Sequence, residues 1–129
     1  MEFRRFNQSD FVPEGWTTAD ALLDDLGFAY VPTQCLSRGR CGIHVHYHPC
    51  GGSVRAVSTS YSLENGLPQY AESSRLVILY PQSAVSGNPV GSGCFDWYGA
   101  TNLEFDTRAG AQLVTVANML ARIHEIVQS

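Results

Sequence analysis

The 129-residue sequence contains no lysine: its eight basic residues are all arginines, and they are scattered along the chain. Without a basic run the chain lacks the usual electrostatic footprint of a nucleic-acid-binding protein, so we expect no nucleic-acid partner. Long apolar runs are also absent. Because a membrane-spanning helix needs about 18 or more consecutive apolar residues, we expect no membrane partner. With 44% hydrophobic and 16% charged residues, the composition predicts one globular domain over residues 1–129.

Several chemical signatures are missing as well. The sequence has no G-x-S-x-G, the motif that holds the nucleophilic serine of α/β-hydrolases on a strand-to-helix turn. It has no C-x-x-C pair, and we expect no cofactor. Residues 1–6 lack the apolar stretch of a secretory signal peptide, so secretion would not be encoded there.

The cysteines are Cys35, Cys41, Cys50 and Cys94. An even number of cysteines permits two disulfides in an oxidising compartment. Four reduced, buried thiols in a reducing compartment are the alternative reading of the same count. Counting does not assign the pairs.

The pattern of apolar residues predicts an α/β sheet piece with flanking helices. The expected segments are an opening loop at 1–16, helices at 17–26, around 68–74 and at 110–127, strands at 28–31, 43–48 and 76–80, and a long loop at 82–108. The strand at 76–80 is continuously apolar, which is typical of a strand buried on both faces. The last helix is expected to bury Leu113, Val116, Ala117, Leu120, Ile123 and Val127.

Residues 43–48 alternate strictly between two kinds of side chain. One face is expected to carry Ile43, Val45 and Tyr47, and the other His44, His46 and His48. Neutral imidazoles beside the Cys50 thiol are suitable ligands for zinc or copper. However, side chains two apart on a strand lie about 6.6 Å apart, too far for three of them to chelate one ion without strand curvature. We therefore predict no metal site, and interpret the histidines as hydrogen-bonded or facing solvent.

The turn at 48–52, His-Pro-Cys-Gly-Gly, ends that strand. In α/β-hydrolases the loop after the third strand donates one backbone N–H to the oxyanion hole. Such a donor contributes roughly 3–4 kcal/mol to transition-state stabilisation, and glycines let the backbone approach a substrate closely. An ordinary strand-ending turn is the alternative.

An aromatic cluster, Phe95-Asp96-Trp97-Tyr98, lies in the long loop. Exposed aromatic rings on a loop can line an apolar crevice. Equally, the rings can pin the loop to the core.

Several motifs in order resemble the secreted polyhydroxybutyrate depolymerases and related esterases. The segment 41–52, Cys-Gly-Ile-His-Val-His-Tyr-His-Pro-Cys-Gly-Gly, resembles the oxyanion strand of that family. The other matching segments are 6–8, 28–32, 70–72, 76–82, Asn88-Pro89, 94–99 and 106–120. The resemblance covers nearly the whole chain but only about the last third of the family's catalytic domain.

The resemblance implies a carboxylic-ester hydrolase with a circularly permuted α/β-hydrolase fold, in which the Ser-His-Asp triad precedes the oxyanion strand. This chain would be the C-terminal portion of such a domain, with a mainly parallel sheet and no triad residue. The Cys50 backbone N–H would be one oxyanion donor. Trp97, Tyr98 and His48 would contact a polyester or small ester substrate. Disulfides Cys35–Cys41 and Cys50–Cys94 and an extracellular location are further implications.

The sequence departs from the family pattern at Pro49, where glycine is usual, and this puts the aim of the Cys50 amide in question. Phe95 and Tyr98 replace family tryptophans. Three hypotheses follow. In the first, the chain is a fragment that needs a missing N-terminal catalytic segment. In the second, it is a truncated and inactive paralogue that binds polyester. In the third, it is a metal-binding protein that uses the histidine ladder.

Overall fold

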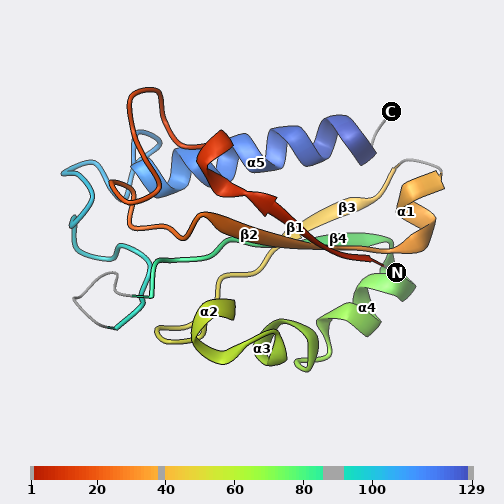
Figure 1. The fold of residues 1–129 in the computed structure, drawn as a ribbon. Coiled ribbons are helices and arrows are strands. Elements are labelled where there is room, and N and C mark those ends of the chain that lie inside the picture. Colours follow the sequence, from red (N-terminus) through yellow and green to blue (C-terminus); the bar gives the residue numbers. More distant parts are fainter. Residues whose placement is uncertain (1, 38–39, 86–91, 128–129) are drawn as a thin grey trace.

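The structure is a computed structural model that describes residues 2–37, 40–85 and 92–127. In chain order the elements are β1 (Glu2–Asn7), the 3-10 helix η1 (Gln8–Asp10), β2 (Leu26–Val31), α1 (Thr33–Ser37), β3 (Gly42–Val45), α2 (Val54–Val57), α3 (Ser60–Leu63), α4 (Leu67–Ser74), β4 (Leu76–Tyr80) and α5 (Ala111–Val127). The sheet lies between α5 on one face and α2, α3 and α4 on the other (Figure 1). None of the helices in the described ranges is long and apolar enough to cross a membrane.

The sheet has the strand order β1-β2-β4-β3. β3 and β4 are parallel, whereas β1–β2 and β2–β4 are antiparallel. The prediction of an α/β fold is therefore confirmed, but the prediction of a mainly parallel sheet is wrong. Two of the three strand pairs are antiparallel: β2 runs against β4, and β1, which we expected to be loop, runs against β2. β1 pairs with β2 from Glu2↔Val31 to Asn7↔Leu26, and its central Arg4 and Arg5 interrupt the apolar alternation that marks a strand.

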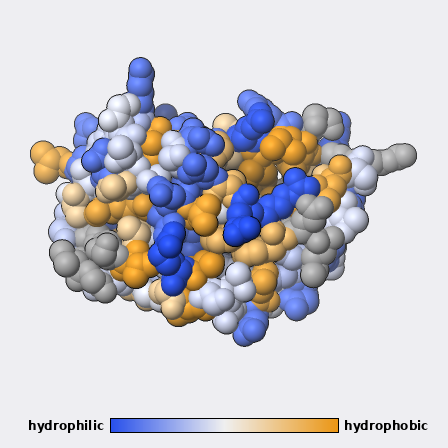
Figure 2. Space-filling view, viewed as in Figure 1, coloured by the Kyte–Doolittle hydropathy of each residue, from blue (hydrophilic) through white to orange (hydrophobic). Residues whose placement is uncertain are grey.

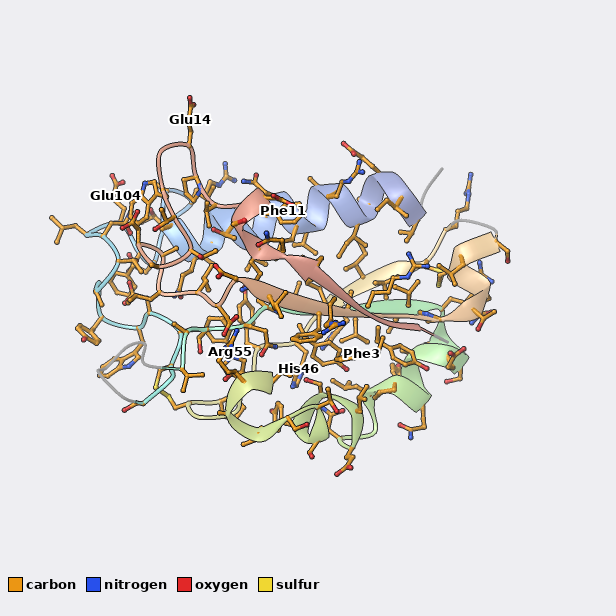
Figure 3. All side chains as sticks on the ribbon, viewed as in Figure 1. Phe3, Phe11, Glu14, His46, Arg55 and Glu104 are labelled. Carbon is orange, nitrogen blue, oxygen red and sulfur yellow. A yellow bond between two sulfur atoms is a disulfide. The ribbon has the colours of Figure 1, made fainter. Side chains whose placement is uncertain are left out.

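β4 is buried on both faces, as predicted. Residues 77–80 are each at most 1% exposed. Ile78 and Tyr80 pack in a cluster with Ala71 of α4, and Leu79 packs with Val116 and Met119 of α5. Phe3 and His46 lie on the α2–α4 side of the sheet, and Phe11 lies on the α5 side (Figure 3). The core therefore consists of two apolar layers separated by the sheet.

α5 begins within one residue of the predicted position, and its predicted buried face is confirmed in part: Val116 and Val127 are buried, and Leu120 and Ile123 pack against the core. Leu113 is 43% exposed and Ala117 is exposed, while Gln112, Thr115 and Met119 are buried. Two polar side chains can occupy the buried stripe because their hydrogen bonds are satisfied. The Thr115 hydroxyl donates to the Ala111 carbonyl at 2.7 Å, and the Gln112 amide bonds two loops.

The predicted helix at 17–26 is wrong, because tertiary bonds draw its residues into turns. The Thr18 hydroxyl donates to the Asp25 carboxylate, and Leu23 forms an isolated bridge with Ser83. Asp24 forms a bidentate ion pair with Arg55 of α2. The side-chain hydrogen bond from Arg55 outweighs burial and lowers the pKa of Asp24. The segment thus ties the sheet to α2 instead of forming a helix.

Candidate functional site

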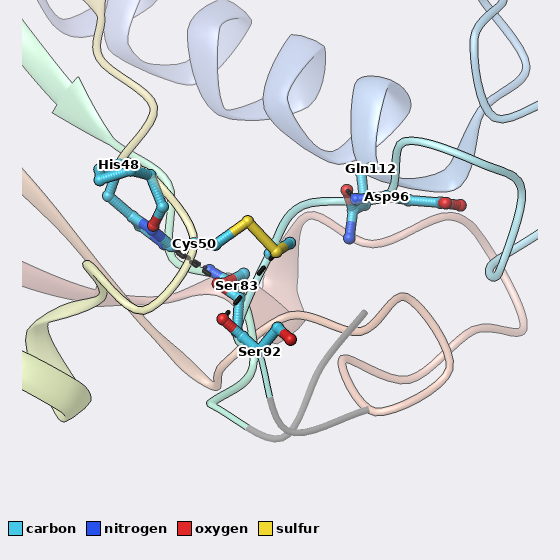
Figure 4. The surroundings of a disulfide bond; sticks show 9 residues. His48, Cys50, Ser83, Ser92, Asp96 and Gln112 are labelled. Atoms are coloured by element: carbon cyan, nitrogen blue, oxygen red, sulfur yellow. Dashed lines mark hydrogen bonds between the residues drawn. A yellow bond between two sulfur atoms is a disulfide. The ribbon is translucent and has the colours of Figure 1, made fainter. Parts of the chain in front are cut away.

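Two disulfides join the cysteines, as predicted. Cys35–Cys41 links α1 to the residue before β3, with 5.9 Å between the Cα atoms. Cys50–Cys94 links the turn after β3 to the loop after β4, with 4.1 Å between the Cα atoms, across 44 residues of sequence (Figure 4). The second disulfide therefore brings together two segments that sequence analysis singled out separately.

The turn after β3 has a defined geometry. β3 ends at Val45, earlier than the predicted strand, and the Gly52 N–H donates to the Pro49 carbonyl at 2.9 Å. Gly51 has a φ of 73°, the left-handed region that favours glycine. A Cβ on Gly52 would meet the Pro49 ring at 2.9 Å. Both glycines are therefore required by the turn itself, which has the pattern of a type II turn.

Cys50 is an exposed residue of this turn. Within the described ranges its N–H donates to no acceptor, whereas the N–H groups of Gly51 and Gly52 both do, to the Gly93 and Pro49 carbonyls. A hydrogen-bond donor that is held in place without a partner can serve an incoming acceptor.

His48 fixes the turn through hydrogen bonds from its ring. Its ring is buried at 6% exposure, and Nε2 accepts the Ser83 amide N–H at 3.1 Å (Figure 4). Because an amide can only donate, the ring proton lies on Nδ1, which donates to the Pro49 carbonyl at 2.7 Å. Burial lowers the pKa of His48, although the Pro49 carbonyl opposes this. With both nitrogens engaged, His48 positions the turn, and the predicted direct contact with substrate does not fit its place.

The other histidines are also accounted for. His44 is exposed on β3, and His46 packs against Tyr61 and Tyr80 with ring centroids 5.5 and 5.9 Å away. Burial, followed by repulsion from His44, lowers the pKa of His46. Because the chain leaves β3 after Val45, the three histidines do not form one ladder. Among the described residues, no cluster of three or more His, Cys, Asp or Glu side chains is arranged to hold a metal ion.

The aromatic loop after Cys94 is organised by Asp96. Its carboxylate accepts hydrogen bonds from four successive backbone amides and one hydroxyl: Tyr98, Gly99, Ala100 and Thr101 N–H, and Thr101 O–H. Burial raises the pKa of Asp96, but the bonds from Thr101, Ala100 and Gly99 outweigh it, and the pKa lies below its usual value. Asp96 is therefore a structural carboxylate.

The rings of this loop divide between two roles. Phe95 packs inward against Tyr47 and His48, with centroid distances of 5.0 and 4.7 Å. Trp97 is 64% exposed and Tyr98 52% exposed, with their rings 4.9 Å apart. The loop is thus pinned by one aromatic residue and presents two others.

A shallow depression of about 310 Å³ lies beside this loop. It is lined by Tyr47, Phe95, Asp96, Phe105, Asp106, Gln112 and Leu113.

Sequence reasoning missed two residues that assemble the site. Ser83 is fully buried, and its hydroxyl donates to the Gly93 carbonyl at 2.8 Å while its amide bonds His48. Gln112 accepts the Asp96 N–H at 2.8 Å and donates to the Ala21 carbonyl at 2.9 Å. A lone serine after a strand and a lone glutamine in a helix carry no sequence signal. The Asn88-Pro89 motif lies outside the described residues.

Comparison with known proteins identifies relatives in sequence, although no protein-family model matches the chain. The chain is 30% identical over 121 residues to the poly(3-hydroxybutyrate) depolymerase of Delftia acidovorans, covering 92% of this chain and 22% of that protein. It is 28% identical over 114 residues to the polyhydroxybutyrate depolymerase of Talaromyces funiculosus, covering 78% of this chain and 33% of that protein. The chain thus spans only a minor part of these relatives.

Two solved structures of PHB depolymerases share the fold of this chain. The crystal structure of the PHB depolymerase from Penicillium funiculosum superposes with a TM-score of 0.84 at 23% identity, over 98% of this chain and 42% of that chain. A PHB depolymerase complexed with an R3HB trimer superposes with a TM-score of 0.85 at 25% identity, over the same shares. Over most of its length the chain is therefore related to polyhydroxybutyrate depolymerases, and it corresponds to a part of these longer proteins.

Proposed function

We propose that this chain is the oxyanion and crevice portion of a carboxylic-ester hydrolase that acts on polyesters of hydroxyalkanoates. The Cys50 backbone N–H would stabilise the oxygen that becomes negative when the ester carbonyl is attacked. Trp97 and Tyr98 would form one wall of the substrate crevice. The family relation supports the reaction class, and the R3HB trimer bound to a structural relative supports an oligoester ligand.

The observation that carries this proposal is the unengaged Cys50 amide on a turn that is fixed from several sides. Oxyanion stabilisation requires a donor that is already aimed before the charge develops. The disulfide to Cys94 and the bonds between His48, Ser83 and the Pro49 carbonyl meet that requirement.

Pro49 is compatible with this role. Its carbonyl accepts both the Gly52 N–H and the His48 Nδ1–H, so this residue contributes through its acceptor. The N–H that proline lacks is not the one that the proposal uses, since the proposed donor belongs to Cys50. The departure from the family pattern therefore does not remove the proposed oxyanion donor.

A pair of double variants tests the Cys50 amide directly. Cys50→Pro/Cys94→Ala and Cys50→Ala/Cys94→Ala both lose the disulfide, but only the first loses the N–H at position 50. Proline is favoured at this position of a type II turn, so the fold of the turn is preserved. The readout is ester hydrolysis by the chain co-expressed with the N-terminal part of a longer relative that carries the triad. We expect kcat of the proline variant to be about 10²–10³-fold below that of the alanine variant. Equal kcat values would refute the oxyanion role.

The chain by itself is expected to have no measurable esterase activity, because the sequence offers no G-x-S-x-G nucleophile. The measurement is hydrolysis of a short-chain p-nitrophenyl ester, with a serine-reactive phosphonate as control. A rate well above buffer that the phosphonate abolishes would show that one of the serines acts as nucleophile.

The missing motif also favours a second candidate function, in which the chain is a catalytically inactive paralogue that binds polyester. This function predicts adsorption to polyhydroxybutyrate granules that depends on Trp97. It also predicts that co-expression with a triad-bearing segment restores no turnover. Restored turnover would instead support the enzyme portion.

Metal binding and compartment are tested separately. We expect no stoichiometric zinc or copper after dialysis against a chelator, and retention of metal that His46→Ala abolishes would favour the metal-binding hypothesis.

The two disulfides support an extracellular or otherwise oxidising location. Four alkylatable thiols in native protein from an oxidising host would contradict that placement.

A further inference from the structure

An apolar groove of about 360 Å³ lies on the α5 face of the sheet, away from the turn and the aromatic loop. It runs between the C-terminal half of α5 and the β1–β2 pair. Its apolar lining includes Phe6, Phe11, Val31, Leu36, Ile123 and Ile126. Figure 2 shows a hollowed orange area bordered by dark blue residues below this half of α5. None of the lining residues belongs to the turn at 49–52 or to the loop at 94–101.

The floor of the groove is built from the core and its sides are open. Val77 and Met119 at the floor are each 1% exposed, whereas Leu36 and Ile126 at the sides are 43% and 57% exposed. A concave site with an apolar floor and apolar sides gains free energy when an apolar chain covers it. The size of the groove is at the lower end of the range typical of small-molecule sites.

The rim of the groove is cationic. Arg4 of β1 lines one side, and Arg122 of α5 lines the other, whereas the side chain of Arg5 shares the opposite face of the sheet with its strand partner Phe28. Arg122 also contacts Glu125 at 3.3 Å, but both side chains are more than 60% exposed, so this pair is weak. Glu125 does not line the groove, and among the described residues no acidic side chain lines it.

We propose that this groove binds an anionic amphiphile: a carboxylate on an unbranched alkyl tail of about eight to twelve carbons. The tail would cover the apolar floor and the exposed side chains of Leu36 and Ile126. The carboxylate would lie at the arginine rim, where guanidinium groups match its planar geometry. A neutral polyester strand would gain nothing from the rim, and a nucleic acid would leave the apolar floor uncovered.

Calorimetric titration with hexanoate, octanoate and decanoate tests the site. Burial of each added methylene predicts about fourfold tighter binding. Decanol, which has the same tail without the charge, is expected to bind more weakly than decanoate, and the difference should shrink at high salt.

Two sets of variants, each with its own control, locate the site. Arg122→Gln and Arg4→Gln should each weaken decanoate binding about two- to fivefold, whereas Arg108→Gln, an exposed arginine elsewhere, should not. Ile126→Gln should weaken binding, whereas Leu103→Gln, at 95% exposure outside the groove, should not. All five substituted residues are exposed, so circular dichroism should show unchanged folds.

Three outcomes would overturn the proposal: no binding of decanoate, equal binding of decanol and decanoate, or equal effects of the Ile126 and Leu103 variants. Sedimentation tests whether a second copy of the chain binds in the groove. Self-association that Ile126→Gln abolishes and that decanoate does not affect would assign the groove to a second copy of the chain. None of these results depends on ester hydrolysis, so failure here leaves the proposed function untouched.

Discussion

The turn at 49–52 and the apolar groove are two sites on one sheet, and they are held together by different forces. The turn is fixed by directional bonds: a disulfide, the His48–Ser83 hydrogen bond and the turn bond from Gly52 to Pro49. The groove is shaped by apolar side chains from five elements, β1, β2, α1, β4 and α5. The difference fits the two proposed tasks. A donor must be aimed at one atom to stabilise a transition state, whereas an alkyl chain needs only apolar surface.

The sharpest way to test this contrast is to remove the directional bonds one by one, beginning with the disulfides. Cys50→Ala/Cys94→Ala should lower the free energy of unfolding by about 4 kcal/mol, because that disulfide closes a long loop. The Cys35–Cys41 disulfide closes a short loop, so Cys35→Ala/Cys41→Ala should lower the free energy of unfolding by about 2.4 kcal/mol. Urea unfolding of the two double variants gives the comparison, and the reverse order would show that loop closure does not govern their stability.

His48→Ala should have the next largest effect, about 1–3 kcal/mol, since it leaves the buried Ser83 N–H without an acceptor. His44→Ala, at an exposed position of the neighbouring strand, is the control.

The pH dependence of the free energy of unfolding gives a second test of His48. Burial lowers the pKa of His48 in the folded state below its unfolded value of about 6.5. Its contribution is therefore fully present above pH 6.5 and declines as the pH falls below that value. The alanine variant should lose this part of the pH dependence, and an unchanged pH profile would contradict the assignment.

The parts of the fold that sequence predicted are those set by local pattern. β4 is a continuous apolar run, and α5 is a long amphipathic segment, so composition and period alone locate both. The disulfide pairs and the turn followed from the family resemblance. These features depend on residues close in sequence or on motifs with fixed spacing.

The parts that sequence missed depend on contacts between distant residues. β1 is defined by its pairing with β2, and the segment 17–26 is held in turns by contacts from Asp24 to Arg55 and from Leu23 to Ser83. His48 is turned inward by an amide 35 residues away. Hydrogen bonds of this kind leave no periodic signal, so a single sequence cannot reveal them.

A smaller effect is expected at the aromatic loop. Asp96→Asn should lower the free energy of unfolding by about 1–2 kcal/mol, because the charged acceptor of several amides becomes a neutral one. The folded-state pKa of Asp96 lies below its unfolded value of 3.8, so its contribution is present above about pH 4 and is lost as the pH falls. Asp106→Asn, an exposed carboxylate of the same region, is the control. Equal destabilisation by the two variants would mean that the carboxylate does not organise the loop.

The smallest effect on stability, and the most informative about function, is expected from Trp97→Ala. The side chain is 64% exposed and contacts Tyr98, so its removal should change the free energy of unfolding by less than about 0.5 kcal/mol. If the loop is a crevice wall, adsorption to polyhydroxybutyrate should nevertheless fall, because an exposed aromatic ring contributes apolar contact area to a polyester strand. Leu103→Ala, which removes an even more exposed apolar side chain from the same loop region, is the matched control. The expected result is a loss of polyester adsorption for the Trp97 variant alone, with decanoate binding at the groove unchanged in both. Parallel losses in the two variants would mean that adsorption follows general exposed hydrophobicity, and the loop would then have no specific role at the substrate.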